Sequence, residues 1–344
     1  MQEYPPRSVS VILVNLNRLD LLRNALRSLL DSPRANTEII VVDNASTDGS
    51  AAMVAAEFPS VRLIRNTTNK GFCEANNQGI ALATGEFIAL LNNDAEAGPG
   101  WLDALVQAIE KNPRAGMAAS KVLVWEDSRR LDKVGHLIFL DGQNRGRGSG
   151  EIDNGQYDTM EDVLWPDGCA ALYRHSMLDE IGGFDEDFFA YADDAELGLR
   201  ARLAGWSCVY APTAVVRHHR GATLGVRSLR RVELIERNRV LLAAKLFPWS
   251  LLCLNGVFYL ARLAAGLWAA IMGRGEISRF PGWKNKLLVA RSMIRADLEA
   301  LAMLPRILRK RRRIRSFRKL STTETIRLLW KHRISLRELS QQSI

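Results

Sequence analysis

Apolar runs and amphipathic stretches alternate along the first hundred residues. Short runs rich in Val, Ile and Leu, typical of buried strands, occupy residues 9–14, 39–42, 61–64 and 87–91. Apolar residues recur at helical spacing between these runs, over residues 19–29, 51–57 and 74–83. Strands that alternate with helices predict a parallel sheet with helices on both faces.

The pattern becomes less regular after residue 100. A helix over 101–111 and a strand over 115–124 are expected next. Residues 125–165 are rich in Gly, Asp and Arg and have no helical period, which predicts a long loop, either functional or a plain linker. A strand over 169–173 and a helix that begins near Asp193 follow.

Charge divides the chain into two regions. Residues 1–225 carry 21 Lys and Arg against 31 acids, whereas residues 226–344 carry 26 against 7. The acidic first region argues against nucleic-acid binding, and the basic second region suits an anionic membrane surface. We therefore expect an α/β domain over 1–225, in two halves (8–124 and 125–225), and a helical, basic, membrane-associating region over 226–344.

The second region contains an apolar stretch, residues 246–273, long enough to span a bilayer. Arg262 lies in its middle, and a central Arg costs a spanning helix about 2.5–3.5 kcal/mol. We therefore favour helices that lie in or on the membrane, or pack on a partner, over a true span. The basic run 306–319, which has no acid, adds attraction to anionic lipid unless it is simply solvated.

Several common classes are disfavoured. The N-terminus has two prolines and no apolar core of useful length, so it does not resemble a secretory signal. The four cysteines stand far apart and predict reduced core thiols: Cys73, Cys169, Cys208 and Cys253. No GxGxxG motif follows the first strand and no P-loop motif occurs, which argues against the usual dinucleotide and mononucleotide sites.

Polar residues follow the predicted strands where they end, at Asn15, Asp43, Asn69 and Asp94. Ligands of parallel sheets bind beyond the carboxyl ends of the strands, so we expect these side chains to converge on one rim, although Asn and Asp also form turns. An Asp there can accept the ring N–H of a pyrimidine, and Lys70 with the backbone at Gly71 can approach phosphates. The NND sequence offers oxygen ligands for a hard cation, with Asn93 between Asn92 and Asp94.

Two adjacent acids, Asp193 and Asp194, stand where a helix is predicted to begin. They suit either a helix cap or a site that uses paired carboxylates. Arg200 either pairs with one of them or lies along the surface. Further on, His218 and His219 taken by themselves are ordinary surface residues.

These motifs occur together in a familiar order. VDNASTDGS, NKGF, LLNND, GGFDEDFFAYADDAELGLR and AGW, within residues 8–225, resemble the inverting family 2 glycosyltransferases, and rhamnosyltransferase-like bacterial members in particular. The resemblance implies an α/β fold of GT-A type, a Rossmann-like mixed sheet with helices on both faces, here followed by C-terminal amphipathic helices. It also implies a nucleotide-sugar donor and a divalent metal, Mg²⁺ or Mn²⁺.

The resemblance assigns roles to individual residues. Asp43 would pair with the base, and the rest of the donor site would comprise Asn15, Asn69, Lys70, Gly71, Asn92, Asn93 and Asp94. The metal would be held by Asp94, His218 and Asn92, with His219 as the alternative to His218. Relatives often have Asp at the position of Asn92. The sugar, acceptor and diphosphate would lie near Asp167, Gly168, Gly221 and Thr223. Asp194 would be the catalytic base, with Asp193 in support.

The implied reaction is inverting transfer of a sugar, with rhamnose favoured, from a dTDP- or UDP-sugar to a hydroxyl of a lipid-linked glycan. The enzyme would be cytoplasmic, peripheral on the inner face of the cell membrane, with no nucleic-acid partner. A nucleotidyltransferase is an alternative, but VNLNRLD is not the Gly-rich, basic loop which that class needs after its first strand. A membrane-bound scaffold with a degenerate nucleotide-sugar site is the other.

Overall fold

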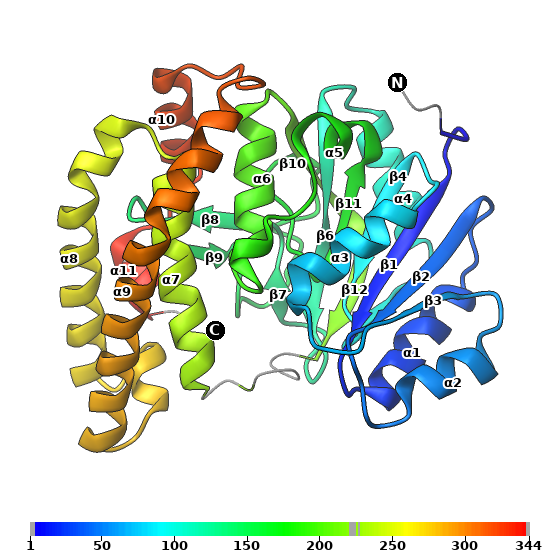
Figure 1. Ribbon diagram of the computed structural model, residues 1–344, viewed down its shortest axis with the longest axis horizontal. Coiled ribbons are helices and arrows are strands. Elements are labelled where there is room, and N and C mark those ends of the chain that lie inside the picture. The colour runs from blue at the N-terminus through cyan, green and yellow to red at the C-terminus, as the bar shows by residue number, and fades with distance from the viewer. Residues whose placement is uncertain (1–3, 220–224, 226–227, 342–344) are drawn as a thin grey trace.

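A mixed ten-stranded sheet forms the centre of the computed structural model, which describes residues 4–219, 225 and 228–341 (Figure 1). Its main path runs in the order β10-β12-β6-β11-β4-β1-β2-β3, with β5 paired to β12 and β7 to β6. The strands are β1 (Val9–Asn15), β2 (Thr37–Asp43), β3 (Arg62–Arg65), β4 (Phe87–Leu91), β5 (Ala95–Ala97), β6 (Ala115–Val124), β7 (Leu131–Lys133), β10 (Glu161–Asp162), β11 (Ala170–Arg174) and β12 (Ser207–His218).

The sheet is parallel at one edge and mixed at the other. Strands β4, β1, β2 and β3 run parallel, as their alternation with helices predicts. Strand β11 runs antiparallel to both β4 and β6, and β12 is parallel to β6. In register, Asn15 of β1 lies opposite Asp43 of β2, so these two polar side chains end neighbouring strands on one rim.

Helices cover both faces. The face with α1 (Leu19–Leu30), α2 (Ser50–Glu57) and α4 (Trp101–Glu110) buries Val11, Leu13 and Val41 of the sheet. The other face carries α3 (Gly71–Leu82), α5 (His175–Ile181) and α6 (Asp193–Leu203), over Ile12 and Ile40. Alternate residues of β1 therefore enter two different cores, which explains why the strand reads as a continuous apolar run.

Residues 125–165 contain short strands and buried side chains in place of the expected long loop. Besides β7 and β10, a hairpin pairs β8 (His136–Ile138) with β9 (Asn144–Gly146). Asp132, Val134 and His136 are all buried. Strands of two or three residues are too short to show a period, which is why the sequence did not reveal them.

The C-terminal region consists of α7 (Leu229–Leu246), α8 (Trp249–Ile271), the short 3₁₀ helix η2 (Glu276–Arg279), α9 (Trp283–Ile314), α10 (Thr322–Lys331) and α11 (Leu336–Gln341). Leu241, Leu242 and Phe247 of α7 and its end join the same hydrophobic core as Ile12 and Trp165. The helical region is thus packed into the core of the α/β part. Cys253 on α8 is exposed, so the prediction that all four cysteines are core thiols is wrong for this one.

The basic run 306–319 is partly engaged with acids of the first region. Lys310 pairs with both Asp185 and Asp187, and Arg306 reaches Asp187 at 2.7 Å. Asp185 also pairs with Lys245 of α7 and, as the N-cap of η1 (Glu186–Phe188), accepts a hydrogen bond from the backbone N–H of Asp187. The acids of GGFDEDFF therefore tie the two regions together through ion pairs.

Candidate active site

A strained turn delivers the paired acids to the start of α6. Phe189, Tyr191 and Ala192 all have positive φ, between 55° and 67°. Such backbone costs a non-glycine residue roughly 1–3 kcal/mol and persists only where the surroundings hold it. Asp193 and Asp194 follow directly, both buried at the N-terminus of the helix, where backbone N–H groups favour negative charge.

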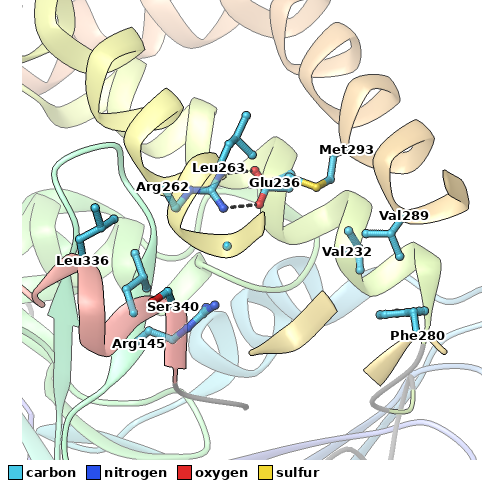
Figure 2. A pocket seen from close by; sticks show the side chains of 12 residues that line it. Arg145, Val232, Glu236, Arg262, Leu263, Phe280, Val289, Met293, Leu336 and Ser340 are labelled. Carbon is cyan, nitrogen blue, oxygen red and sulfur yellow. Dashed lines mark hydrogen bonds and ion pairs between the residues drawn. The ribbon is translucent and has the colours of Figure 1, made fainter. Parts of the chain in front are cut away.

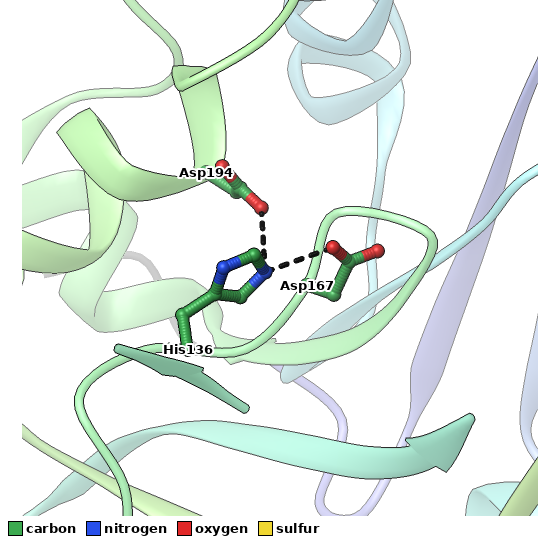
Figure 3. Close-up of side chains that lie close together, drawn as sticks. All are labelled: His136, Asp167 and Asp194. Atoms are coloured by element: carbon green, nitrogen blue, oxygen red, sulfur yellow. Dashed lines mark hydrogen bonds and ion pairs between the residues drawn. The ribbon is translucent and has the colours of Figure 1, made fainter. Parts of the chain in front are cut away.

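Asp194 lies in a buried cluster with His136 and Asp167. The Nε2 atom of His136 is 2.9 Å from Oδ2 of Asp167 and 3.3 Å from Oδ2 of Asp194, and Figure 3 shows the ring between the two carboxylates. The ring of His136 also stacks on Trp165, at 5.9 Å between centroids. Nε2 of His136 therefore lies between two acids from distant parts of the chain.

The pKa values of the buried acids in and beside this cluster are shifted in different directions. Burial and then the neighbouring charge of Asp194 raise the pKa of Asp193 well above its ordinary value. Burial likewise raises the pKa of Asp194, against the opposing effect of His136. Burial also acts on Asp167, but Lys133, with Nζ 2.7 Å away, and His136 outweigh it and hold its pKa well below the ordinary value. Asp167 is thus the permanent anion, and Asp194 is the acid whose charge can change.

A second buried centre joins Asp94 and His218. Nε2 of His218 lies 3.4 Å from Oδ1 of Asp94, while Nδ1 lies 2.7 Å from Oδ2 of Asp132. Burial opposes a charge on this ring, but Cys169, Asp132 and Asp94 outweigh burial and raise the pKa of His218 well above its ordinary value. Asp132 fixes the ring so that Nε2 faces Asp94.

This second centre fits a divalent cation. Oδ1 of Asp94 is buried without a hydrogen-bond partner, which is costly for a carboxylate unless a cation completes it. A bound cation would take the place of the Nε2 proton that the raised pKa of His218 favours. A histidine that ligates through one nitrogen and meets a carboxylate through the other is typical of metal sites. Asn92 is half-buried two residues before Asp94. His219, the alternative ligand, stacks on Trp125 at 4.1 Å, and only its backbone N–H bonds to the carbonyl of Asp94, at 2.9 Å.

The cluster around Asp194 is a poorer metal site, although within the described part of the chain it is the group of His and Asp side chains close enough to share an ion: His136, Asp167 and Asp194. The ammonium of Lys133 already neutralises Asp167 at 2.7 Å. A divalent ion there would face this fixed positive charge.

One turn connects the two centres. The backbone N–H of Gly168 points to Oδ2 of Asp194 at 3.4 Å, and Oδ1 of Asp167 accepts a hydrogen bond from the N–H of Cys169 at 2.8 Å. The carbonyl of Cys169 in turn accepts a hydrogen bond from the N–H of Asn92, also at 2.8 Å. The candidate base and the candidate cation ligands therefore lie on either side of residues 167–169.

The strand-end residues form a connected polar network. Nδ2 of Asn15 donates to Oγ of Ser46 at 3.1 Å and lies 3.4 Å from Oδ1 of Asp43, and Oδ1 of Asn15 accepts from Asn93 at 2.7 Å. The expected convergence on one rim is thus present for Asn15, Asp43 and the NND segment. Asn93 links this network to the segment of Asp94.

Asn44, which the sequence reading overlooked, organises the next turn. Its side chain donates to Oδ1 of Asn69 at 2.9 Å and to the carbonyl of Gly71 at 3.1 Å, and it accepts from the N–H of Lys70 at 2.9 Å. Asn69 also accepts from the N–H of Gly71. Asn69 therefore shapes the turn, while the side chain of Lys70 is exposed beside Glu74.

Arg200 pairs with Glu196 at 2.8 Å and donates to the carbonyls of residues 181–183. It is buried, so both alternatives, pairing with Asp193 or Asp194 and lying along the surface, are wrong. Gly221 and Thr223 lie outside the described residues. Asp132, Lys133 and His136 were missed; the available signal was the close spacing of three chemically active side chains before the apolar run LIFL.

A protein-family model matches the chain. The model described as "Glycosyl transferase family 2" matches residues 10–182, half of the chain. The matched range contains the donor-side rim, the segment with His136, and the turn at Asp167.

Two curated relatives are each 29% identical to the chain over the aligned residues. An "N-acetylglucosaminyl-diphospho-decaprenol L-rhamnosyltransferase" of Mycobacterium tuberculosis is 29% identical over 225 residues, which cover 59% of this chain and 73% of that protein. An "O-antigen biosynthesis protein RfbC" of Myxococcus xanthus is also 29% identical, over 64% of this chain but only 18% of its own length.

Solved structures agree in fold. A mannosyltransferase from Pyrobaculum calidifontis "in complex with GDP-Man and Mn2+" covers 95% of this chain and 86% of its own, with a TM-score of 0.51 and 20% identity. A crystal structure of "GalNAc-T7 with UDP, GalNAc and Mn2+" covers 69% of this chain and 50% of its own, with a TM-score of 0.53 and 14% identity. At these identities the likeness concerns the fold, which is of GT-A type.

Proposed function

Because the chain belongs to glycosyl transferase family 2 and is a glycosyltransferase, we propose that it moves a sugar, with rhamnose favoured, from a dTDP- or UDP-sugar to a hydroxyl of a polyprenyl-linked glycan. The observation that carries the proposal is the placement of Asp194 and the Asp94–His218 pair on either side of residues 167–169. Rhamnose and a polyprenyl-linked acceptor are supported by the name of the mycobacterial relative.

In this proposal Asp194 is the catalytic base. The acceptor hydroxyl oxygen attacks the anomeric carbon, its proton passes to a carboxylate oxygen of Asp194, and the bond from that carbon to the diphosphate oxygen breaks with inversion. A base must be ionised and within hydrogen-bonding reach of the hydroxyl. Nε2 of His136 and the backbone N–H of Gly168 both face Oδ2 of Asp194, and together they orient its carboxylate.

Different residues of the donor site would bind the base, the diphosphate and the cation. Asp43 would accept the N–H of the pyrimidine base beside Asn15, and exposed Lys70 would approach the diphosphate. Asp94 and His218, with Asn92 beside them, would hold Mg²⁺ or Mn²⁺; bound there, the ion supplies positive charge that stabilises the departing diphosphate. Asp132 keeps the ring of His218 turned toward Asp94.

A transfer assay with the full chain tests the proposal. Radiolabelled dTDP-rhamnose and a polyprenyl-linked glycan are incubated with Mn²⁺ and either wild type, Asp194→Asn, or the control Asp103→Asn, which changes an exposed residue of α4. Loss of the general base is expected to reduce transfer by about 10²–10⁴-fold, while donor-induced thermal stabilisation persists. Unchanged transfer by Asp194→Asn would refute its role as base.

The same assay separates the alternatives. Replacing the donor with other dTDP-, UDP- and GDP-sugars identifies the sugar and the nucleotide. Stabilisation by a donor without turnover on any acceptor would favour the degenerate scaffold. We also place the enzyme on the cytoplasmic face of the membrane, where a polyprenyl-linked acceptor is accessible; this location is supported by the basic, apolar C-terminal region.

A further inference from the structure

Helix α8 exposes an uncharged stripe along its whole length. The exposed positions recur at helical spacing and include Cys253, Val257, Leu260, Ala264, Leu267, Trp268 and Ile271. Leu260 and Leu267 are 66% and 63% exposed. In Figure 1 the helix runs along the edge of the molecule farthest from β3. Such a surface is too apolar and too long to be ordinary solvent-facing helix.

By length and composition α8 is, within the described residues, the one helix able to cross a membrane. Its other side, however, is tied to the α/β part of the molecule. Arg262 donates to both carboxylate oxygens of Glu236, at 2.8 and 2.7 Å, and reaches Asp141 at 2.5 Å. Figure 2 shows the Arg262–Glu236 pair in the pocket between α7, α8, α9 and α11.

These ion pairs hold α8 in place. Glu236 and Asp141 are buried, and Arg262 is the cation that α8 supplies to both of them. Tyr259 of the same helix adds a 2.6 Å hydrogen bond to Asp297 of α9. Moving α8 away to cross a bilayer would leave two buried carboxylates with fewer partners, which is strongly unfavourable. The arrangement therefore fits a helix that stays against the protein with its outer side free.

Helix α9, beside α8, adds the charge expected at a lipid surface. Its exposed apolar positions, Leu287, Ile294, Leu298 and Leu301, alternate with exposed Lys284, Lys286, Arg291 and Arg295. The exposed positions of α8 and α9 include no acid. A second copy of the chain would bring the same basic residues against these, whereas anionic headgroups complement them.

We propose that the outer face of α8 and α9 docks on an anionic bilayer, with α8 lying in the plane of the interface and not across the membrane. The apolar stripe enters the boundary between headgroups and acyl chains, and the Lys and Arg residues of α9 contact the headgroups. This inference deepens the proposed location of the enzyme. Its test uses no donor or acceptor, so its failure is distinguishable from failure of the proposed transfer.

Sedimentation with vesicles tests the docking. Full-length protein is mixed with vesicles of phosphatidylcholine alone or with an equal part of phosphatidylglycerol. Binding is expected only to the anionic vesicles and is weakened by salt. Leu260→Asp with Leu267→Asp should reduce binding at least about tenfold, since two charges enter the apolar layer. The control, Leu30→Asp with Met160→Asp, replaces exposed apolar residues of the α/β part and should bind as wild type.

Two results of the vesicle assay would overturn the docking: no binding by wild type, or equal binding by the Leu260→Asp, Leu267→Asp variant. Analytical ultracentrifugation of the free protein adds a third. A dimer that this variant loses would identify a second copy as the occupant and would also overturn the docking.

The depth of α8 in the bilayer distinguishes a helix that lies in the interface plane from a helix that crosses the membrane. Cys253 is the exposed cysteine, the other three being buried, and Cys253, Leu260 and Leu267 are spaced by seven residues on one face. A fluorophore is placed on Cys253, or on Leu260→Cys or Leu267→Cys in a Cys253→Ser background. A helix in the interface plane predicts equal quenching of all three by a nitroxide near the headgroups. Stronger quenching of position 260 by a nitroxide at the bilayer centre shows a span and overturns the proposal.

Discussion

The side-chain amide of Asn238 donates a hydrogen bond of 2.7 Å to the backbone carbonyl of Tyr191, two residues before the paired acids. The same amide reaches the carbonyls of Phe188 and Ala190, both at 2.9 Å, so its two hydrogens serve three acceptors. Arg237 adds a 3.0 Å bond to the carbonyl of Phe188. The strained turn that presents Asp193 and Asp194 is therefore held from α7, a helix of the C-terminal region.

This contact predicts that Asn238→Asp impairs turnover. Asp has nearly the same shape but replaces the donor with an acceptor that faces three carbonyls, and each unsatisfied buried group costs about 1–3 kcal/mol. We expect the turn to relax and kcat to fall at least about tenfold. Asn112→Asp, which removes one bond to a carbonyl at the end of α4, is the control and should retain kcat. Equal kcat in both variants would show that the Asn238 clamp is dispensable.

The family and the GT-A fold were predicted from the sequence, and both predictions are confirmed. The parallel part of the sheet could be predicted because each strand is a continuous apolar run that ends at a polar residue, as with Val42 before Asp43. That pattern arises from burial on both faces of the sheet, so it is carried by local sequence.

The residues that contact the site residues could not be predicted from local sequence. His136 acts on Asp194 from 58 positions away, and Asp132 acts on His218 across 86. Such contacts depend on how short strands such as β7 and β8 lie beside the sheet, and three-residue strands carry no periodic signal. Asn238 was missed for a different reason: its acceptors are backbone carbonyls, which leave no trace in residue type.

His136 is expected to set the pH range of transfer. The rate should rise as pH increases through the raised pKa of Asp194, because the base acts only when ionised. His136 opposes that increase in pKa, so His136→Phe, which keeps a ring against Trp165, should move the rising limb of kcat/KM to higher pH. His136→Gln, which restores an N–H donor, should lower kcat less than His136→Phe does. A limb that stays in place in both variants excludes this role.

Asp193 is expected to reduce stability at neutral pH. Its pKa is raised in the folded state by burial and by Asp194, so its contribution to stability is complete at low pH and is lost as pH rises from about 4, the ordinary value, through the folded pKa. Asp193→Asn removes this loss. We expect a gain of about 0.5–2 kcal/mol at pH 7, a range common for such relief, and none at pH 3.

Urea unfolding at the two pH values measures this difference. Asp179→Asn, on α5 where the carboxylate only accepts a bond from Tyr4, is a control that should show no such gain. An Asp193→Asn variant that is less stable at pH 7 than at pH 3, relative to wild type, would contradict the assignment of a raised pKa.

Asp132 is expected to support the cation through His218. It accepts from Nδ1 at 2.7 Å and so fixes which nitrogen faces Asp94. Carboxylates in this relation to a ligating histidine usually contribute 10–100-fold to metal affinity. Asp132→Asn should therefore weaken Mn²⁺ binding by about that factor, measured from free Mn²⁺ by electron paramagnetic resonance. Asp127→Asn, nearby and bonded to Arg129, should leave affinity unchanged, and the same loss in both variants would contradict the prediction.

Gly71 is expected to tolerate no side chain because of Phe189. It has φ of +78°, and a Cβ there would lie 2.5 Å from Cδ2 of Phe189, whose backbone carbonyl accepts from the N–H of Phe72 at 2.7 Å. Gly100 has a similar φ of +71° but open space around its Cβ position. Gly100→Ala should thus cost only the backbone term, about 1–2 kcal/mol, whereas Gly71→Ala should cost more and also reduce kcat by displacing the turn before Asp193. The extra loss of unfolding free energy in Gly71→Ala, relative to Gly100→Ala, should disappear when Phe189→Ala is combined with Gly71→Ala. If the extra loss remains, the ring of Phe189 is not the obstacle.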